Sequence, residues 1–274
     1  MQFLSDIFKY DFLQRSLLAA LLASIACGIL GAYSLVRRNS YMTGAVSHSL
    51  LGGIGLARYL CVCAGLSFAT PILGATIAAI VAAVIITVLP TLKKVRTDTV
   101  LSAVWTVSVA LGICLVAAIP GYAEDLNSYL FGNILLITKE DLIFMAILDL
   151  LIVLSVLAFR TRFTAFCFQR EMLTLRGISP FLTELLLNLL SALAIVLLVQ
   201  LAGIVMALAL FTLPIAAAAH ICKRLNSIML LGGIFCFAST ALGLAISYAP
   251  EWHTGAVTII VAAAIYVITA IIRK

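Results

Sequence analysis

The sequence predicts an all-α polytopic membrane protein with about eight or nine transmembrane helices. Hydrophobic residues make up 64% of its 274 residues and charged residues only 10%, whereas soluble domains are roughly one-quarter charged. Its mean hydropathy is +1.23. Apolar runs of about 20 residues recur along the chain, and a helix of that length crosses a hydrocarbon core of roughly 30 Å. Helices are expected because lipid offers no hydrogen-bond partner to unpaired backbone groups.

Nine apolar spans follow one another along the chain. They cover residues 16–36, 42–63, 68–89, 99–119, 141–159, 181–201, 203–221, 228–248 and 254–272. Gly44, Gly52, Gly53 and Gly55 interrupt the second span, so the count falls to eight if this stretch is irregular rather than one full crossing. Pro214 predicts a kink in the seventh span, because proline removes a backbone hydrogen bond of the helix.

The basic residues set the predicted orientation. With nine spans, 13 of the 17 Lys and Arg residues fall on one side of the membrane. The positive-inside rule then places the C-terminus in the cytoplasm and the N-terminus outside. The formal net charge of +6 does not indicate nucleic-acid binding, because the basic residues are scattered in short clusters between the apolar runs.

Two connections between spans are longer than the others. Residues 120–141 form an outer connection that begins with acidic residues, and residues 158–184 form a basic, amphipathic cytoplasmic region. Such a region packs either on lipid head groups or on a cytoplasmic partner protein, and its charge does not distinguish the two. We expect residues 1–274 to form a single transmembrane domain.

Five segments, in order along nearly the whole chain, resemble the permease subunits of bacterial manganese, zinc and iron ABC importers. Residues 31–53 resemble the family pattern R-x-M-S-Y-x-G-D-x-x-x-H, which a run of small residues follows. The other four segments are DLNSYLFGNILLITKEDL, LRGISPFLTELLL, GIVMALALFTLPIAAAAHICKR and WHTGAVTIIVAA. Each segment alone is weak because apolar sequences match by chance, but five collinear matches are specific.

The resemblance implies the membrane half of an importer in the bacterial cytoplasmic (inner) membrane. Two such subunits pair, most simply as a homodimer, two separate ATPase subunits dock below, and an extracytoplasmic solute-binding protein delivers the metal. The chain lacks G-x-x-x-x-G-K-[ST], so ATP hydrolysis is expected in the partner and not in this translocation subunit. The resemblance places the coupling to the ATPase at Glu171, Arg176, Gly177, Ile178 and Ser179. No permanently bound cofactor is expected, only a transported divalent ion.

His48 is the best candidate for contact with the metal. An ionisable group in a membrane span is costly unless it is partnered or faces water, so it indicates function by default. The alternative is a neutral imidazole that shares a hydrogen bond with a neighbouring helix; the resemblance favours the pathway. The chain departs from the family pattern at Gly44, where the family commonly carries Asp one helical turn before the histidine.

Three further residues are candidates for the metal pathway. Asp149 lies near the middle of the fifth span and is either a pathway ligand or gate or a structural hydrogen-bond partner. Glu251 and His253 flank Trp252 in an outer loop, where they relay metal or are simply solvated. His220, at the cytoplasmic end of the seventh span, is expected to be a helix-end residue that the helix dipole favours, with a site at the exit of the metal path as the alternative.

Zinc is preferred over manganese and iron because histidines are the most evident ligands and imidazole suits zinc. The second interpretation is a permease for iron-chelate or cobalamin-type cargo, whose path needs no metal ligands. An intramembrane enzyme has no support, since the sequence contains neither H-E-x-x-H nor G-x-S-x-G.

Overall fold

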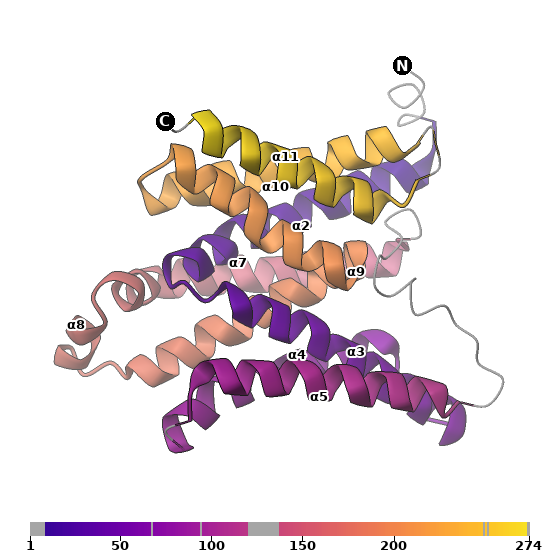
Figure 1. The fold of residues 1–274 in the computed structure, drawn as a ribbon, viewed down its shortest axis with the longest axis horizontal. Helices are drawn as coiled ribbons and strands as arrows, with labels where there is room; N and C mark the ends of the chain where they lie inside the picture. Colours follow the sequence, from indigo (N-terminus) through magenta and orange to yellow (C-terminus); the bar gives the residue numbers. More distant parts are fainter. Residues whose placement is uncertain are drawn as a thin grey trace. The chain divides into compact units, whose positions relative to one another are not determined.

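The computed structural model describes residues 9–66, 68–93, 95–119, 137–248, 250 and 252–272, and all regular secondary structure within these ranges is helical. The helices are α2 (Asp11–Val36), α3 (Ser40–Cys63), α4 (Pro71–Lys93), α5 (Thr97–Ala117), α7 (Lys139–Phe168), α8 (Arg170–Leu175), α9 (Pro180–Ile221), α10 (Leu225–Tyr248) and α11 (Thr254–Ile272). Figure 1 shows them along the chain.

The described part of the chain contains nine segments that are long and apolar enough to cross a membrane. This confirms the predicted all-α polytopic class. α3 is a continuous helix from Ser40 to Cys63, so its glycines do not make it irregular. The sixth and seventh spans are the two halves of α9, which Gly203 divides with φ 79° and ψ 173°. Pro214, where a kink was expected, lies inside the second half of α9.

The chain divides into two compact units. The first unit comprises Met1–Arg38, Asn127–Ala158 and Leu197–Lys274, and the second comprises Asn39–Leu126 and Phe159–Val196. The single domain predicted for residues 1–274 stays a prediction.

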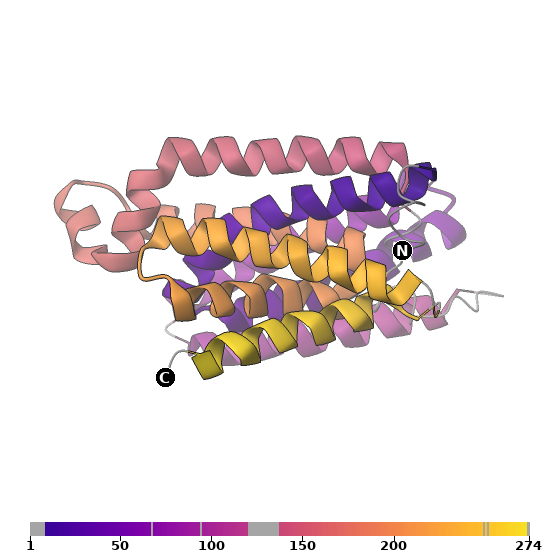
Figure 2. The same cartoon turned by 90° about the horizontal axis from the view of Figure 1, so that it is seen from above.

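In the first unit, α10 packs between α2 and α11 (Figure 2). Small residues allow this close packing: a Cβ atom added to Gly28 of α2 would lie 2.6 Å from the Met229 carbonyl oxygen of α10. At the other side of α10, the Ser247 hydroxyl donates a hydrogen bond of 3.0 Å to the Thr254 hydroxyl of α11. Helices in lipid commonly associate through close approach of their backbones, because burying apolar side chains gains little free energy where the surrounding lipid is itself apolar.

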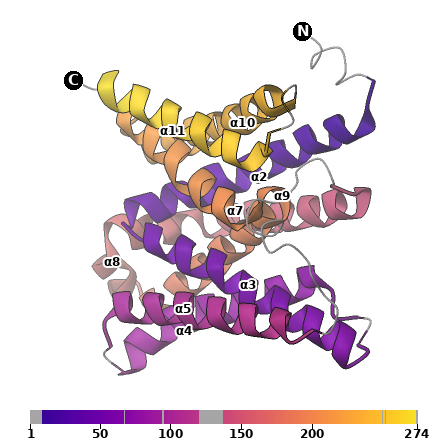
Figure 3. The same cartoon turned by 45° about the vertical axis from the view of Figure 1, so that its right-hand side comes forward.

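In the second unit, α3 packs against both α4 and α5 (Figure 3). The contact with α5 is close, since a Cβ atom added to Gly52 would lie 2.7 Å from the Ser108 carbonyl oxygen. The first part of α9 joins the same unit, where the buried Asn188 amide donates a hydrogen bond of 2.9 Å to the Thr87 hydroxyl of α4. The α3 to α5 contact positions the candidate site.

Candidate functional site

His48 lies on α3, and its ring stacks on the indole of Trp105 from α5. The ring centroids are 4.4 Å apart and the ring planes differ by 13°. His48 is only partly buried, so its imidazole retains access from outside the helix contact. At about 1.5 Å per residue, the histidine lies roughly 12 Å along α3 from its first residue. This position is within the span and not at its edge.

Gly44 makes room for the stack. It precedes His48 by one helical turn, and a Cβ atom added to it would lie 3.0 Å from Cζ3 of the Trp105 indole. That distance is tighter than an ordinary van der Waals contact, so a larger residue at this position requires the indole to move. The indole therefore occupies the space beside α3 that a side chain of residue 44 would take.

His48 has no cluster of other metal ligands around it in the described part of the chain. No group of three or more His, Cys, Asp or Glu side chains within the described residues could hold a metal ion. A resident metal site of the structural kind takes about four such ligands. The role of His48 on a metal path stays a prediction.

Asp149 lies on α7 in the first unit and is only 5% exposed. Its carboxyl group interacts with the backbone of Ala26 in α2, while Oδ1 has no hydrogen-bond partner. One buried oxygen left unpaired in an apolar span is costly. The contact with Ala26 gives Asp149 a structural partner, and its role as a pathway ligand or gate stays a prediction.

The outer pair is only half described. Glu251 lies outside the described residues. His253 is exposed immediately before α11, and its carbonyl oxygen accepts the first backbone hydrogen bond of that helix from Val257, at 3.2 Å. Trp252 beside it is 63% exposed. The relay role of Glu251 and His253 stays a prediction.

His220 lies in the last turn of α9, as expected of a helix-end residue. Its ring contacts Tyr266 of α11 in a tilted arrangement, with centroids 5.3 Å apart and planes at 45°. The contact ties the end of α9 to α11 within the first unit. A packing role accounts for this histidine without metal.

The predicted coupling segment folds as a short helix followed by a sharp turn. α8 ends in a Schellman motif: the Ile178 N–H donates to the Leu173 carbonyl at 2.9 Å and the Gly177 N–H donates to the Thr174 carbonyl at 3.0 Å. Gly177 adopts a φ of 69°, which favours glycine. α9 then begins at Pro180, directly after Ser179, and proline suits this first position because it has no N–H to leave unpaired.

Arg170 contacts the helices on both sides of α8. It pairs with Glu184 of α9 at 3.4 Å and lies 5.3 Å from the Phe166 ring centroid of α7. Glu171 and Arg176 are exposed, and Leu175 is 87% exposed. The docking role of this segment stays a prediction, because a single exposed leucine is ordinary on a protein surface.

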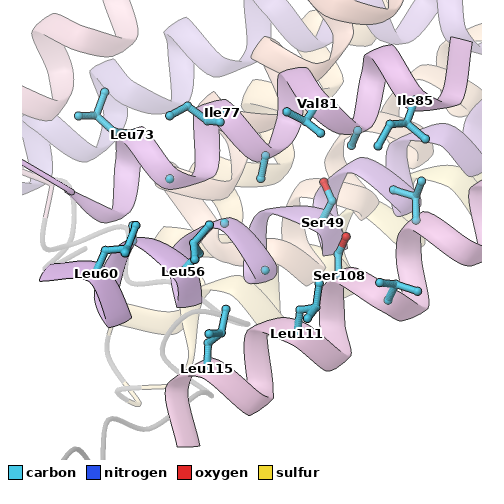
Figure 4. A pocket seen from close by; sticks show the side chains of 18 of the residues that line it. Ser49, Leu56, Leu60, Leu73, Ile77, Val81, Ile85, Ser108, Leu111 and Leu115 are labelled. Carbon is cyan, nitrogen blue, oxygen red and sulfur yellow. The ribbon is translucent and has the colours of Figure 1, made fainter. Parts of the chain in front are cut away.

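A groove of about 870 Å³ opens over α3 between α4 and α5 (Figure 4). Its walls are apolar, with Leu73, Ile77, Val81 and Ile85 on α4. Ser49 and Ser108 are polar, but the groove contains no His, Cys, Asp or Glu. It therefore offers no ligand set for a metal.

Sequence reasoning missed Trp105. Tryptophan in membrane proteins is enriched at the two membrane interfaces, whereas Trp105 lies in the ninth position of the 21-residue helix α5. An indole this far inside a span was a signal that the sequence carried. Only the fold, however, identifies His48 and Gly44 as its neighbours.

Comparison with known proteins decides the family. The family described as "ABC 3 transport family" matches residues 9–273. The chain belongs to the ABC 3 transport family. The resemblance drawn from the five sequence segments is thereby confirmed.

Relatives of this family member carry names that mention metals. A "Probable metal transport system membrane protein" of Chlamydia trachomatis is 34% identical over 94% of this chain and 88% of its own. The "Manganese transport system membrane protein MntC" of Halalkalibacterium halodurans is 30% identical over 96% of this chain and 88% of its own. A "Probable iron transport system membrane protein" of Haemophilus influenzae is 30% identical over 97% of this chain and 95% of its own.

The fold of this ABC 3 family member also matches a solved structure. "PsaBC from Streptococcus pneumoniae in complex with Fab" contains a chain with a TM-score of 0.85 and 27% identity, covering 98% of this chain and 94% of that one. The permease fold expected from the sequence is confirmed.

Proposed function

We propose that this chain is the membrane-spanning permease subunit of an ABC importer for a divalent transition metal, with zinc preferred over manganese and iron. The observation that carries the proposal is His48, a partly exposed imidazole inside a membrane span of a transport-family member. An ionisable side chain in that position indicates a transport path. The metal named in the relatives' descriptions supports metal ions over chelates as cargo.

The preference for zinc rests on the ligand type. Manganese favours carboxylate, carbonyl and water oxygens, whereas imidazole suits zinc. Residue 44, one turn before His48, is a glycine and supplies no oxygen ligand from its side chain. Asp149, Glu251 and His253 complete the proposed pathway, with the outer pair receiving the ion from an extracytoplasmic binding protein.

Separate ATPase subunits supply the energy for transport by hydrolysing ATP. They dock at the turn formed by Glu171, Arg176, Gly177, Ile178 and Ser179. The exposed Glu171 on α8 and the exposed Arg176, which follows α8 just before the turn at Gly177, support this assignment. We place two copies of the permease in the bacterial cytoplasmic membrane, with the C-terminus in the cytoplasm. A reporter fused after Lys274 should be active only in the cytoplasm, and activity outside would overturn the orientation.

The decisive experiment reconstitutes the permease into lipid vesicles with an ATPase subunit and a solute-binding protein from the same organism. We expect ATP-dependent accumulation of zinc above that of manganese or iron, and none without the permease. Uptake of a ferric chelate or of cobalamin, with no uptake of free ions, would instead establish the alternative cargo. Manganese accumulation above zinc would retain the importer and overturn the zinc preference.

A further inference from the structure

We propose that Trp105 positions the His48 ring on the ion's path and, together with Gly44, restricts the site to a single imidazole ligand from α3. The inference rests on the proposed function, since it assigns specificity to the same site. It adds a residue on a different helix, and it explains why residue 44 is a glycine in this chain.

The first step is the stack itself. Two planar rings 4.4 Å apart at 13° lie face to face, so one face of the imidazole is covered by the indole. Both ring nitrogens of an imidazole lie in its plane, and a metal binds in that plane. Covering one face therefore leaves the ligand function intact while fixing the plane in which an ion is bound.

The second step concerns the space at residue 44. Side chains four residues apart on a helix are neighbours, so residue 44 is the position on α3 from which a second ligand would join His48. The indole fills that position, because even a methyl group on Gly44 would lie 3.0 Å from Cζ3 of Trp105. The same aromatic side chain thus orients one ligand and excludes another.

The chemical consequence is selectivity against ions that need oxygen ligands. Trp105 offers the site an aromatic face instead of a carboxylate, and its only polar group is an N–H donor, which has no lone pair to give to a metal ion. An imidazole and water remain available, a set that suits zinc better than manganese. A site with one protein ligand from α3 also releases its ion readily, as a transport path requires.

Tryptophan fluorescence tests the juxtaposition directly. The chain contains two tryptophans, Trp105 and Trp252, and Trp252 is 63% exposed in a loop, so Trp252→Phe leaves Trp105 as the single fluorophore. With ring centroids 4.4 Å apart and a metal-to-nitrogen distance of about 2.1 Å, an ion on His48 lies within about 8 Å of the indole. We expect Co²⁺, used as the probe, to quench Trp105 saturably in the full chain in lipid nanodiscs.

Three outcomes of the quenching experiment decide the first half of the proposal. Quenching that His48→Gln removes and that Zn²⁺ reverses at lower concentration than Mn²⁺ supports it. Quenching that persists in His48→Gln overturns it, and so does its absence in the Trp252→Phe parent. If His48→Gln also abolishes zinc uptake while the parent shows no quenching, the proposed function stands and this inference alone fails.

A pair of substitutions tests the second half. Gly44→Asp alone should lower uptake of every ion, because the new side chain meets the indole. Gly44→Asp with Trp105→Ala should lower the ratio of zinc to manganese uptake by about 10- to 100-fold, the range in which residues around a metal ligand act. Trp105→Phe keeps a ring over the imidazole and should retain the parental ratio.

A matched control guards against a merely structural effect. Tyr266→Ala removes the aromatic partner of a different histidine, His220, in the first unit. It should leave the ratio of zinc to manganese uptake unchanged, as should any variant that only lowers the amount of folded protein. A parental ratio in the Gly44→Asp, Trp105→Ala double variant, at parental abundance in the membrane, would overturn the assignment of specificity.

Discussion

Two histidines of this permease lie against aromatic rings, and their surroundings differ. His48 stacks face to face on Trp105 within the second unit, inside a span, with a glycine clearing the space beside it. His220 meets Tyr266 at 45° within the first unit, in the last turn of α9. A cationic or polar group at a helix C-terminus is stabilised by the helix dipole, whereas one inside a span has no such explanation.

The difference shows how position separates two uses of the same residue type. At a helix end, imidazole packs and interacts with the dipole, and a tilted aromatic contact is enough to hold it. Inside a span, a partly exposed imidazole is costly to hold, and here the helix that carries it also carries the glycine that makes room for the stacked indole. The proposed contact with an ion would account for that cost.

Exchanging the two histidines for glutamine should give the largest contrast. His48→Gln keeps approximate size and hydrogen bonding but binds metal poorly, so zinc uptake in intact cells should fall at least about tenfold. His220→Gln should retain most of the parental uptake. Both variants must be shown to reach the membrane and to assemble with the ATPase in parental amounts. Normal uptake by an assembled His48→Gln variant would remove this residue from the path.

The second prediction distinguishes two causes of lost uptake: damage to the ion's path, and loss of the coupling between the permease and the ATPase. Gly177 and Gly65 share a φ of 69° and have no atoms within 4 Å of an added Cβ atom. Valine at either position costs about 1–3 kcal/mol of local strain. Gly177→Val should abolish both uptake and transport-coupled ATP hydrolysis, whereas the matched Gly65→Val variant should keep both.

The outcome of this pair locates the ATPase contact. His48→Gln, in contrast, should lose zinc uptake while the assembled complex still hydrolyses ATP. Coupled ATP hydrolysis at the parental rate in Gly177→Val would show that another cytoplasmic loop makes the contact. An equal loss in Gly65→Val would show that the strain, and not the position of the turn, is responsible.

Most of the fold was predictable because a span has a simple signal. Length and apolarity identify each crossing, and the predicted bounds of the last span, 254–272, agree with α11. The sequence predicts a kink at Pro214, but the residue with non-helical φ and ψ in α9 is Gly203. A proline always lacks the backbone N–H, so its effect on a helix can be expected from the sequence. A glycine tolerates a positive φ without imposing one, so whether it breaks a helix depends on the packing around it.

The candidate site was predictable in its parts and not in its assembly. His48 stands out in sequence because ionisable residues are rare inside spans. Gly44 looked like a missing ligand, and the structure shows what fills its place, an indole 61 positions later in the chain. Contacts between helices distant in sequence follow from packing, which a single sequence does not specify.

Asp149 extends the comparison to a carboxyl group that is buried inside a span of the first unit. Asp149→Asn keeps the size of the side chain and its contact with the Ala26 backbone but removes the charge. We expect zinc uptake to fall about fivefold, equivalent to about 1 kcal/mol. Asp98→Asn serves as the control, because Asp98 is an exposed carboxylate at the start of α5. Parental uptake in Asp149→Asn would assign this carboxyl group a structural role only.

The smallest effect should come from replacing one glycine by alanine in each unit: Gly44 on α3 in the second unit and Gly232 on α10 in the first. Gly44→Ala places a Cβ atom 3.0 Å from the Trp105 ring, and a rigid indole must shift together with the imidazole stacked on it. Gly232→Ala places one 2.8 Å from Cδ1 of Ile215, the far end of a flexible side chain that can rotate away.

Alanine gains about 1 kcal/mol over glycine in a helix, and overpacking costs about 1–3 kcal/mol where the neighbour cannot give. Gly232→Ala should therefore raise the thermal unfolding midpoint of the purified permease or leave it unchanged, with parental zinc uptake. Gly44→Ala should lower both the midpoint and the uptake, and should change the emission of Trp105 in the Trp252→Phe background. If Gly44→Ala instead leaves emission and uptake unchanged, the indole is free to move, and the stack on His48 is not the device that orients the ligand.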